Sequence, residues 1–137
     1  FLRLKRSAKA PNTVSQTIRN LVPGRLYSLK LLSSDYGDLL AGRSDARKTG
    51  PGIDLANVEV LAAKSVDALS ATKWFRGVPA FSPANPYWVT YHYRVFRARA
   101  EMARLTLSDW LSESEAGGPP GQETACNFVE VQPYLEE

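Results

Sequence analysis

The chain has 137 residues and a single cysteine, Cys126, which excludes a disulfide within the chain and a cysteine-based zinc site. This length suits one domain with its own hydrophobic core, and we expect residues 1–137 to form a single domain. No apolar run approaches the ~20 residues that span a bilayer, so membrane insertion is not expected.

The charge is unevenly distributed along the chain. Residues 1–50 carry 10 Lys and Arg against 3 Asp and Glu, whereas residues 51–137 carry 7 against 11. The basic half either attracts an anionic partner, such as an acidic polysaccharide, nucleic acid or a membrane surface, or is an ordinary solvated strand face. Most aromatic residues lie after residue 73, away from the basic excess, and this separation disfavours a nucleic-acid platform.

Alternation of polar and apolar residues predicts a mostly β chain. We expect strands at residues 1–5, 13–21, 25–32, 52–60, 88–98, 103–108 and 126–133. The first segment alternates and lacks the apolar region of a signal peptide, which favours a mature protein or a module of a longer one. Pro23 and Gly24 suit the two central positions of a type II turn between the second and third strands.

Turn signals and weak helical patterns separate the strands. Within residues 52–60 the alternation slips at Ala56–Asn57, which predicts a bulge or a very tight turn. Residues 66–73 have a weak helical pattern and are predicted as a short helix. Three prolines make residues 77–87 a loop, and Ser108 suits the cap of a single helical turn.

No predicted helix is long enough to cover a parallel sheet. The sequence therefore predicts an all-β fold, namely an antiparallel two-sheet β-sandwich of the jelly-roll type.

Four patches of sequence resemble the galactose-binding-like jelly-roll carbohydrate-binding modules. They are Ser15–Leu32, with a Gln-bearing strand, a Pro-Gly corner and a Tyr-led strand; the strand-turn-strand element at 52–60; the paired segments 94–98 and 103–108; and the closing segment Asn127–Tyr134. Asn127 stands where such modules commonly have Asp, which weakens any inference of a calcium ligand there. The resemblance implies an extracellular or periplasmic module that holds an attached catalytic domain or surface protein near a polysaccharide.

Residue types that support catalysis are sparse. His92 is the single histidine, so any Ser-His-Asp or Cys-His arrangement depends on it, and a strand histidine with a satisfied ring is the favoured interpretation. Neither a Gly-Xaa-Ser-Xaa-Gly elbow nor a phosphate-binding glycine loop is present. The carboxylates near Asp35 and Asp109 lie in polar loops, where nothing indicates the desolvation that a general acid needs. We therefore predict a non-catalytic module, accessory to a carbohydrate-active enzyme.

Binding chemistry is better supplied, because flat aromatic rings stack on sugars and polar side chains bond their hydroxyls. The candidate ligand-binding residues are Asp35, Tyr36, Trp74, Arg76, Tyr87, Trp88, Tyr91, Tyr93 and Arg94. Tyr91 and Tyr93 are expected on the strand face opposite to Phe96, as either a sugar-stacking row or a cross-strand aromatic ladder. Trp74 and Trp88 either bind sugar or plug one end of the sandwich.

The segment Ser33–Asp38 combines carboxylates, hydroxyls and an aromatic ring. It suits hydroxyl recognition, a structural calcium ion or an ordinary Asp-Gly turn, and no other cofactor is expected.

Three functions stay open on the sequence. The main prediction is a non-catalytic module that binds a polysaccharide or oligosaccharide. The alternative is a structural or protein-interaction β-sandwich, in which the same aromatic residues pack against a neighbouring domain or subunit. The third is an accessory domain that lends one side of an active-site cleft to a hydrolase on the same polypeptide.

Overall fold

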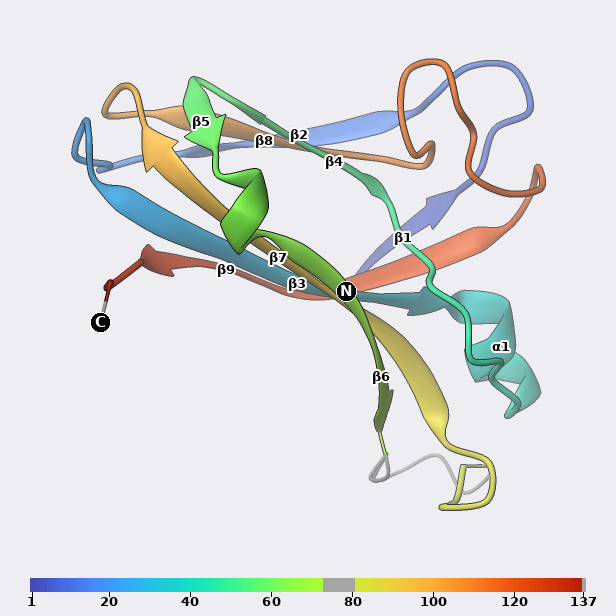
Figure 1. Cartoon of the computed structure of the whole chain (residues 1–137). Coiled ribbons are helices and arrows are strands. Elements are labelled where there is room, and N and C mark those ends of the chain that lie inside the picture. Colours follow the sequence, from blue (N-terminus) through green and yellow to red (C-terminus); the bar gives the residue numbers. More distant parts are fainter. Residues whose placement is uncertain (73–80, 137) are drawn as a thin grey trace.

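The computed structural model describes residues 1–72 and 81–136, and these form two antiparallel sheets packed face to face (Figure 1). The large sheet has the order β1 (Leu2–Lys5), β9 (Glu123–Pro133), β3 (Leu26–Asp35), β7 (Tyr87–Ala98), β5 (Val58–Val60), with β6 (Val66–Thr72) also paired to β7. The small sheet has the order β2 (Thr13–Ile18), β8 (Ala103–Ser108), β4 (Gly52–Ala56). The predicted all-β, antiparallel two-sheet sandwich is confirmed.

Apolar residues from alternate strand positions meet between the sheets and form the core. Leu29 and Leu31 of β3 and Phe96 of β7 pack with Leu105 and Leu107 of β8. Full burial of side chains of this size stabilises the fold by about 1.5–3 kcal/mol each. Cys126 of β9 belongs to the same core, beside Leu2 of β1 in the register of the sheet.

The connection between β2 and β3 is the turn that the sequence predicts. The N–H of Arg25 donates to the carbonyl of Val22 at 3.1 Å, and Gly24 has φ = +84°. A type II turn requires positive φ at its third residue, a conformation that glycine adopts without a steric penalty.

The predicted slip at Ala56–Asn57 is the point where the chain changes sheets. Residues 52–60 form two strands rather than one: β4 pairs with β8 in the small sheet and β5 pairs with β7 in the large sheet. Asn57 has φ = +63°, a left-handed conformation that asparagine tolerates better than most residues. This residue therefore joins the two layers with a single tight corner.

The predicted helix at residues 66–73 is wrong. Residues 66–72 form strand β6, which pairs with β7 along its whole length. A short segment with a weak helical pattern gains little as an isolated helix, whereas the ladder with β7 satisfies its backbone groups.

Two further local predictions differ from the structure. Helix α1 (Tyr36–Ala41) begins where a loop was expected, and the Asp35 carboxylate caps it by accepting the N–H of Asp38 at 3.0 Å. The Ser108 hydroxyl accepts the N–H of Trp110 at 3.1 Å, but no helix follows.

In the predicted loop, residues 81–86 form a turn closed by a bridge between Ser82 and Asn85, and residues 77–80 lie outside the described residues.

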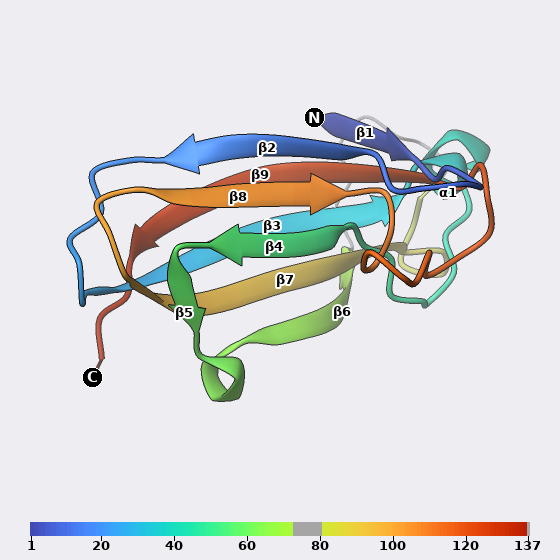
Figure 2. The ribbon, with the colours of Figure 1, turned by 90° about the horizontal axis from the view of Figure 1, so that it is seen from above.

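The two sheets differ in width, which leaves part of the large sheet uncovered. Figures 1 and 2 show β6 and the adjoining part of β7 extending past β4, the last strand of the small sheet on that side. We call the inner face of β6 and of residues 87–94 of β7 the overhang. On the opposite side, β2 forms the free edge of the small sheet.

In the described part of the chain, no helix has the length and apolar character needed to cross a membrane.

Candidate functional site

The overhang carries a line of polar side chains. Strand alternation directs Thr90, His92 and Arg94 of β7 inward, and Asp67 of β6 lies directly opposite His92 in the register. The segment before β4 crosses above them, and the N–H of Thr49 donates to Thr90 Oγ1 at 2.8 Å. Gly50 permits this close approach, because a Cβ there would lie only 2.8 Å from Cε1 of His92.

The space between the crossing segment and the overhang is a solvent-open pocket of about 360 Å³, which we call the overhang pocket. Its charged and titratable lining residues are Arg6, Lys48, Asp67, His92 and Arg94. They come from four separate parts of the chain: the end of β1, the segment before β4, β6 and β7.

Asp67 and Arg94 form a two-point ion pair in this pocket. The two terminal nitrogens of Arg94 donate to Oδ1 and Oδ2 of Asp67 at 2.8 and 3.1 Å. Partial burial on its own would raise the pKa of Asp67, but the hydrogen bonds from Arg94 and His92 outweigh it and lower the pKa. The Asp67 side chain is 41% exposed and that of Arg94 is 20% exposed, so a ligand can reach both.

His92 is buried behind this pair with both ring nitrogens engaged. Its Nδ1 lies 2.7 Å from Oδ1 of Asp67 and its Nε2 lies 2.7 Å from Oγ of Ser33. Burial lowers the pKa of His92, against the opposing effect of the Asp67 carboxylate. The predicted strand histidine with a satisfied ring is confirmed.

Ser33, His92 and Asp67 are linked by hydrogen bonds in the sequence of a Ser-His-Asp triad, but the serine is inaccessible. Ser33 is 1% exposed, and its hydroxyl also lies within hydrogen-bonding distance of the Thr49 carbonyl. A triad serine must approach a substrate carbonyl carbon directly. The arrangement therefore holds the His92 ring in place rather than presenting a nucleophile to the pocket.

The predicted tyrosine pair lies on the other face of the large sheet. Tyr91 and Tyr93 are half-buried there, with ring centroids 6.0 Å apart and planes 15° apart. The predicted face is confirmed, because Phe96, at the opposite parity, is fully buried in the core. Stacking on sugar and stacking on each other both remain compatible with this geometry.

The other predicted aromatic residues do not gather around one surface. Tyr87 is buried, its hydroxyl pairs with that of Ser34, and burial raises its pKa. Trp88 is half-buried at an inward-facing position of the overhang, where its backbone N–H donates to Ser44 Oγ at 3.0 Å. Trp74 and Arg76 lie outside the described residues.

Asp35 and Tyr36 are engaged in local structure at the start of α1. Besides capping α1, the Asp35 carboxylate accepts bonds from Gln122 at 3.0 Å and from Arg47 at 3.1 Å. Arg47 also contacts Asp38 at 3.1 Å, so its guanidinium partly neutralises the carboxylates that suggested calcium. The ring of Tyr36 lies 4.9 Å from the guanidinium of Arg3. Among the described residues, no group of three or more His, Cys, Asp or Glu side chains is placed to hold a metal ion.

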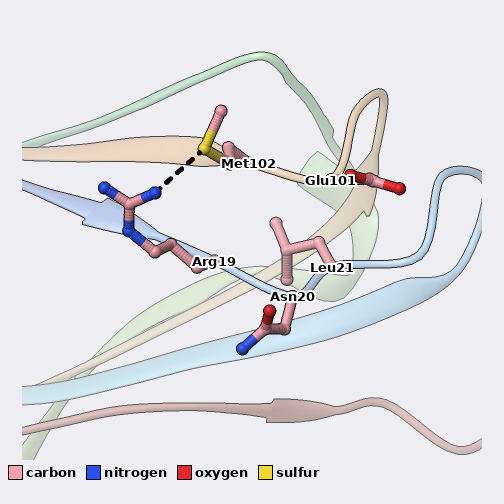
Figure 3. A pocket seen from close by; sticks show the side chains of 5 residues that line it. All are labelled: Arg19, Asn20, Leu21, Glu101 and Met102. Carbon is pink, nitrogen blue, oxygen red and sulfur yellow. Dashed lines mark hydrogen bonds between the residues drawn. The ribbon is translucent and has the colours of Figure 1, made fainter.

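A second hollow, of about 350 Å³, lies at the opposite end of the small sheet. Figure 3 shows its lining, which comes from the connections after β2 and before β8: Arg19, Asn20, Leu21, Glu101 and Met102. A guanidinium nitrogen of Arg19 lies 3.4 Å from the sulfur of Met102. Among the residues that line this hollow, no carboxylate is paired with a guanidinium, whereas the overhang pocket holds the pair of Asp67 and Arg94, so the overhang pocket is the better candidate site.

Of the residues that line the overhang pocket, sequence reasoning selected Arg94 but missed Asp67, Lys48 and Arg6; Trp88, which it also selected, lies on the overhang but is not among the lining residues. The Asp67 position was detectable, because a strand at 66–72 places one acidic residue beside the inward-facing residues of β7. Lys48 and Arg6 carry no local signal, since only the tertiary fold brings them to the pocket.

Comparisons with protein-family models, curated proteins and solved structures give no match for this chain. Its function must therefore be inferred from its own residues.

Proposed function

We propose that this β-sandwich is a non-catalytic carbohydrate-binding domain that uses the overhang pocket as its site. The observation that carries the proposal is the partly exposed pair of Asp67 and Arg94, fixed side by side in a pocket. A carboxylate accepts hydrogen bonds and a guanidinium donates them, so the pair matches neighbouring hydroxyl groups of a sugar ring.

The pair is held in place before any ligand arrives. One terminal nitrogen of Arg94 also lies 3.1 Å from the carbonyl of Tyr93 and 3.3 Å from that of Val66, and His92 holds Asp67 from the other side. Side chains that are already ordered lose less conformational entropy on binding. This preorganisation supports a recognition role without a chemical step.

Thr90 and His92, which lie between Trp88 and Arg94 on the inner face of β7, are only 1% and 5% exposed, because residues 49 and 50 cross above them. A glycan therefore reaches Asp67 and Arg94 through the opening of the overhang pocket and not along the strand from Trp88. The ligand class is an oligosaccharide or polysaccharide, as the resemblance to galactose-binding-like modules implies. An attached catalytic domain and an extracellular or periplasmic location belong to the same proposal.

Affinity electrophoresis against neutral and acidic polysaccharides tests the proposal. We expect retardation by at least one glycan class and a loss of about tenfold in affinity for Asp67→Asn, since a bond to a charged group contributes about 1.5–3 kcal/mol. Asp54→Asn is the matched control, because Asp54 is exposed on β4 and does not line the overhang pocket. A folded wild-type protein that no glycan retards, or equal affinities for the two variants, contradicts the proposal.

A second candidate function is protein interaction through the free edge of β2. Strand β2 carries no charged residue, nearly all of it is exposed, and within the described residues it pairs with β8 alone. Beside it lie two hollows of about 300 and 290 Å³, whose shared lining includes Leu105 and Val129. Edge strands without charge or proline are templates for pairing with another chain.

Sedimentation over a concentration series tests this second candidate. Val14 is 43% exposed and points into one of these hollows, so Val14→Lys is expected to abolish association of the wild-type protein. A wild-type protein that stays monomeric over the series contradicts the candidate.

A further inference from the structure

The overhang pocket has an excess of positive charge. Arg6, Lys48 and Arg94 line it, against the single carboxylate of Asp67. Charges of one sign in a concave site with low-dielectric walls raise the local concentration of opposite charges.

Arg6 is a buried cation that forms no ion pair with any residue that the structure describes. It is 5% exposed, and its terminal nitrogens donate to neutral oxygens: the carbonyls of Asp109 (2.7 Å) and Ala116 and the side-chain carbonyl of Gln122 (3.0 Å). Its Nε has no hydrogen-bond partner in the described part of the chain. A buried guanidinium normally has a carboxylate or another anion beside it, because an uncompensated charge is costly to bury.

Lys48 supplies a second free positive charge at the mouth of the pocket. It is exposed, and it makes no ion pair or hydrogen bond with any residue in the ranges 1–72 and 81–136. Its neighbour Arg47 differs, because that guanidinium is engaged by Asp35, Asp38 and Asp45. Only Lys48 of these two is available to a ligand.

The positive and negative groups of the pocket have different partners. The charge of Arg94 is matched by Asp67, whereas those of Arg6 and Lys48 are not matched by any carboxylate in the described residues. An anionic group would therefore bind toward Arg6 and Lys48 and be repelled by Asp67, which leaves Asp67 and Arg94 for hydroxyl groups. A ligand that carries both kinds of group satisfies the whole pocket.

We infer that the overhang pocket binds acidic saccharides, with the carboxylate or sulfate of the sugar beside Arg6 and Lys48 and the hydroxyls at Asp67 and Arg94. This inference rests on the proposed function and narrows its ligand class to anionic glycans. Carboxylate and sulfate share the chemistry that the two cations recognise, so the ligand panel must separate them.

The test compares ligands that share a sugar backbone and differ in charge. Polygalacturonate and its fully methyl-esterified form share one backbone, as do dextran sulfate and dextran, and calorimetry with each gives the affinity. We expect the charged member of at least one pair to bind about tenfold more tightly, with a salt dependence that the neutral member lacks. Equal affinities within both pairs overturn the inference. Tighter binding confined to polygalacturonate identifies a carboxylate site, and tighter binding confined to dextran sulfate identifies a sulfate site.

Variants at two lysines, the exposed Lys48 and the half-buried Lys30, show whether the effect belongs to this pocket. Lys48→Gln is expected to lower affinity for the charged ligand several-fold and to leave stability unchanged, because Lys48 is exposed and has no hydrogen bond or ion pair within residues 1–72 and 81–136. Lys30→Gln is the matched control, since Lys30 lies opposite Tyr93 on the outer face of the large sheet. Equal effects of the two variants contradict the inference.

NMR spectroscopy tests the role of Arg6 in binding without a substitution, because replacing this buried residue would destabilise the fold. The Nε–H signal of Arg6 in proton–nitrogen NMR spectra is expected to shift when the charged oligosaccharide is added and to stay unchanged with its esterified form. An unchanged signal with both ligands overturns the role of Arg6. If neutral glycans bind equally well and Asp67→Asn weakens that binding about tenfold, the proposed function stands and the acidic ligand class is wrong. If no glycan binds at all, the proposed function itself fails.

Discussion

His92 has a complete set of hydrogen bonds in either protonation state. When the ring is neutral, Nδ1–H donates to Asp67 and Nε2 accepts the hydroxyl proton of Ser33. When the ring is protonated, Nε2–H donates to Ser33 Oγ, and the hydroxyl proton turns to the Thr49 carbonyl, which lies within bonding distance. The ring therefore does not need to move when it takes up a proton.

Titration of His92 nevertheless makes stability depend on pH. Burial lowers the pKa of His92 below its ordinary value of about 6.5, so the unfolded chain binds the proton first as pH falls. The contribution of neutral His92 to stability is complete above the ordinary pKa of about 6.5, which applies to the unfolded chain. It is lost as the pH falls from there through the lower pKa of His92 in the folded protein. We expect the free energy of unfolding, measured in urea from neutral to mildly acidic pH, to fall more in the wild type than in His92→Gln. If the free energy of unfolding falls equally in the wild type and in His92→Gln, His92 does not cause the pH dependence.

Phe96 and Phe128 are a matched pair for measuring the core. Phe96 is fully buried, whereas Phe128 on β9 is 69% exposed. We expect Phe96→Ala to lower the free energy of unfolding by about 3–5 kcal/mol, from lost burial and the cavity that is left. Phe128→Ala is expected to change it by less than about 0.5 kcal/mol. Denaturant unfolding of both variants measures the difference, and similar losses would place the core elsewhere.

At the scale of the elements, local pattern predicted the strands that alternate and missed those defined by pairing. Strand β8 alternates polar and apolar residues over its whole length, and β3 and β7 alternate over residues 27–31 and 89–95, so the positions of these strands follow from the sequence alone. Strand β6 is built from small residues with little contrast, and only its ladder with β7 makes it a strand. Helix α1 has six residues and depends on the Asp35 cap, which a loop turn also uses.

The candidate site was predictable to the same limited extent. Strand alternation predicted that Arg94 and Trp88 lie on one face of β7 and Tyr91 and Tyr93 on the other, because alternation depends only on positions within one strand. The meeting of Arg6, Lys48 and Asp67 depends on how three distant segments pack, and a single sequence carries no record of that.

The corner at Asn57 gives a prediction about β4 and β5. Valine is costly at φ = +63°, because its branched Cβ crowds the backbone, whereas glycine adopts that conformation freely. We expect Asn57→Val to lower the free energy of unfolding by about 1–2 kcal/mol. Asn57→Gly is the control and is expected to stay within a few tenths of a kcal/mol of the wild type. Equal stabilities would show that the corner adopts another conformation in solution.

At the scale of the whole molecule, the unequal width of the two sheets gives the sandwich two different sides. On one side the large sheet extends past β4 (Figure 2), and the overhang pocket lies there. On the other side, residues of β2 and β9 line a mostly apolar hollow. The two candidate functions therefore use separate surfaces and can be tested independently.

The topology also predicts slow folding. The chain ends pair with each other through β1 and β9, and β8 pairs with both β2 and β4, so most ladders join distant segments. Closing long loops before contacts form is entropically costly, and domains of this kind fold in milliseconds to seconds. Stopped-flow tryptophan fluorescence measures the rate, and folding within microseconds would contradict the topology.

Cys126 gives this chain a built-in reporter of its own opening. The thiol is 1% exposed, and burial raises its pKa to about 12, so alkylating reagents find no thiolate while β9 stays in the sheet. The rate of Cys126 labelling therefore measures the fraction of molecules in which the large sheet has opened. Any compound that binds only the folded form lowers that fraction and slows labelling. Candidate glycans can thus be ranked by the protection they give to one sulfur atom, without attaching a dye or immobilising either partner.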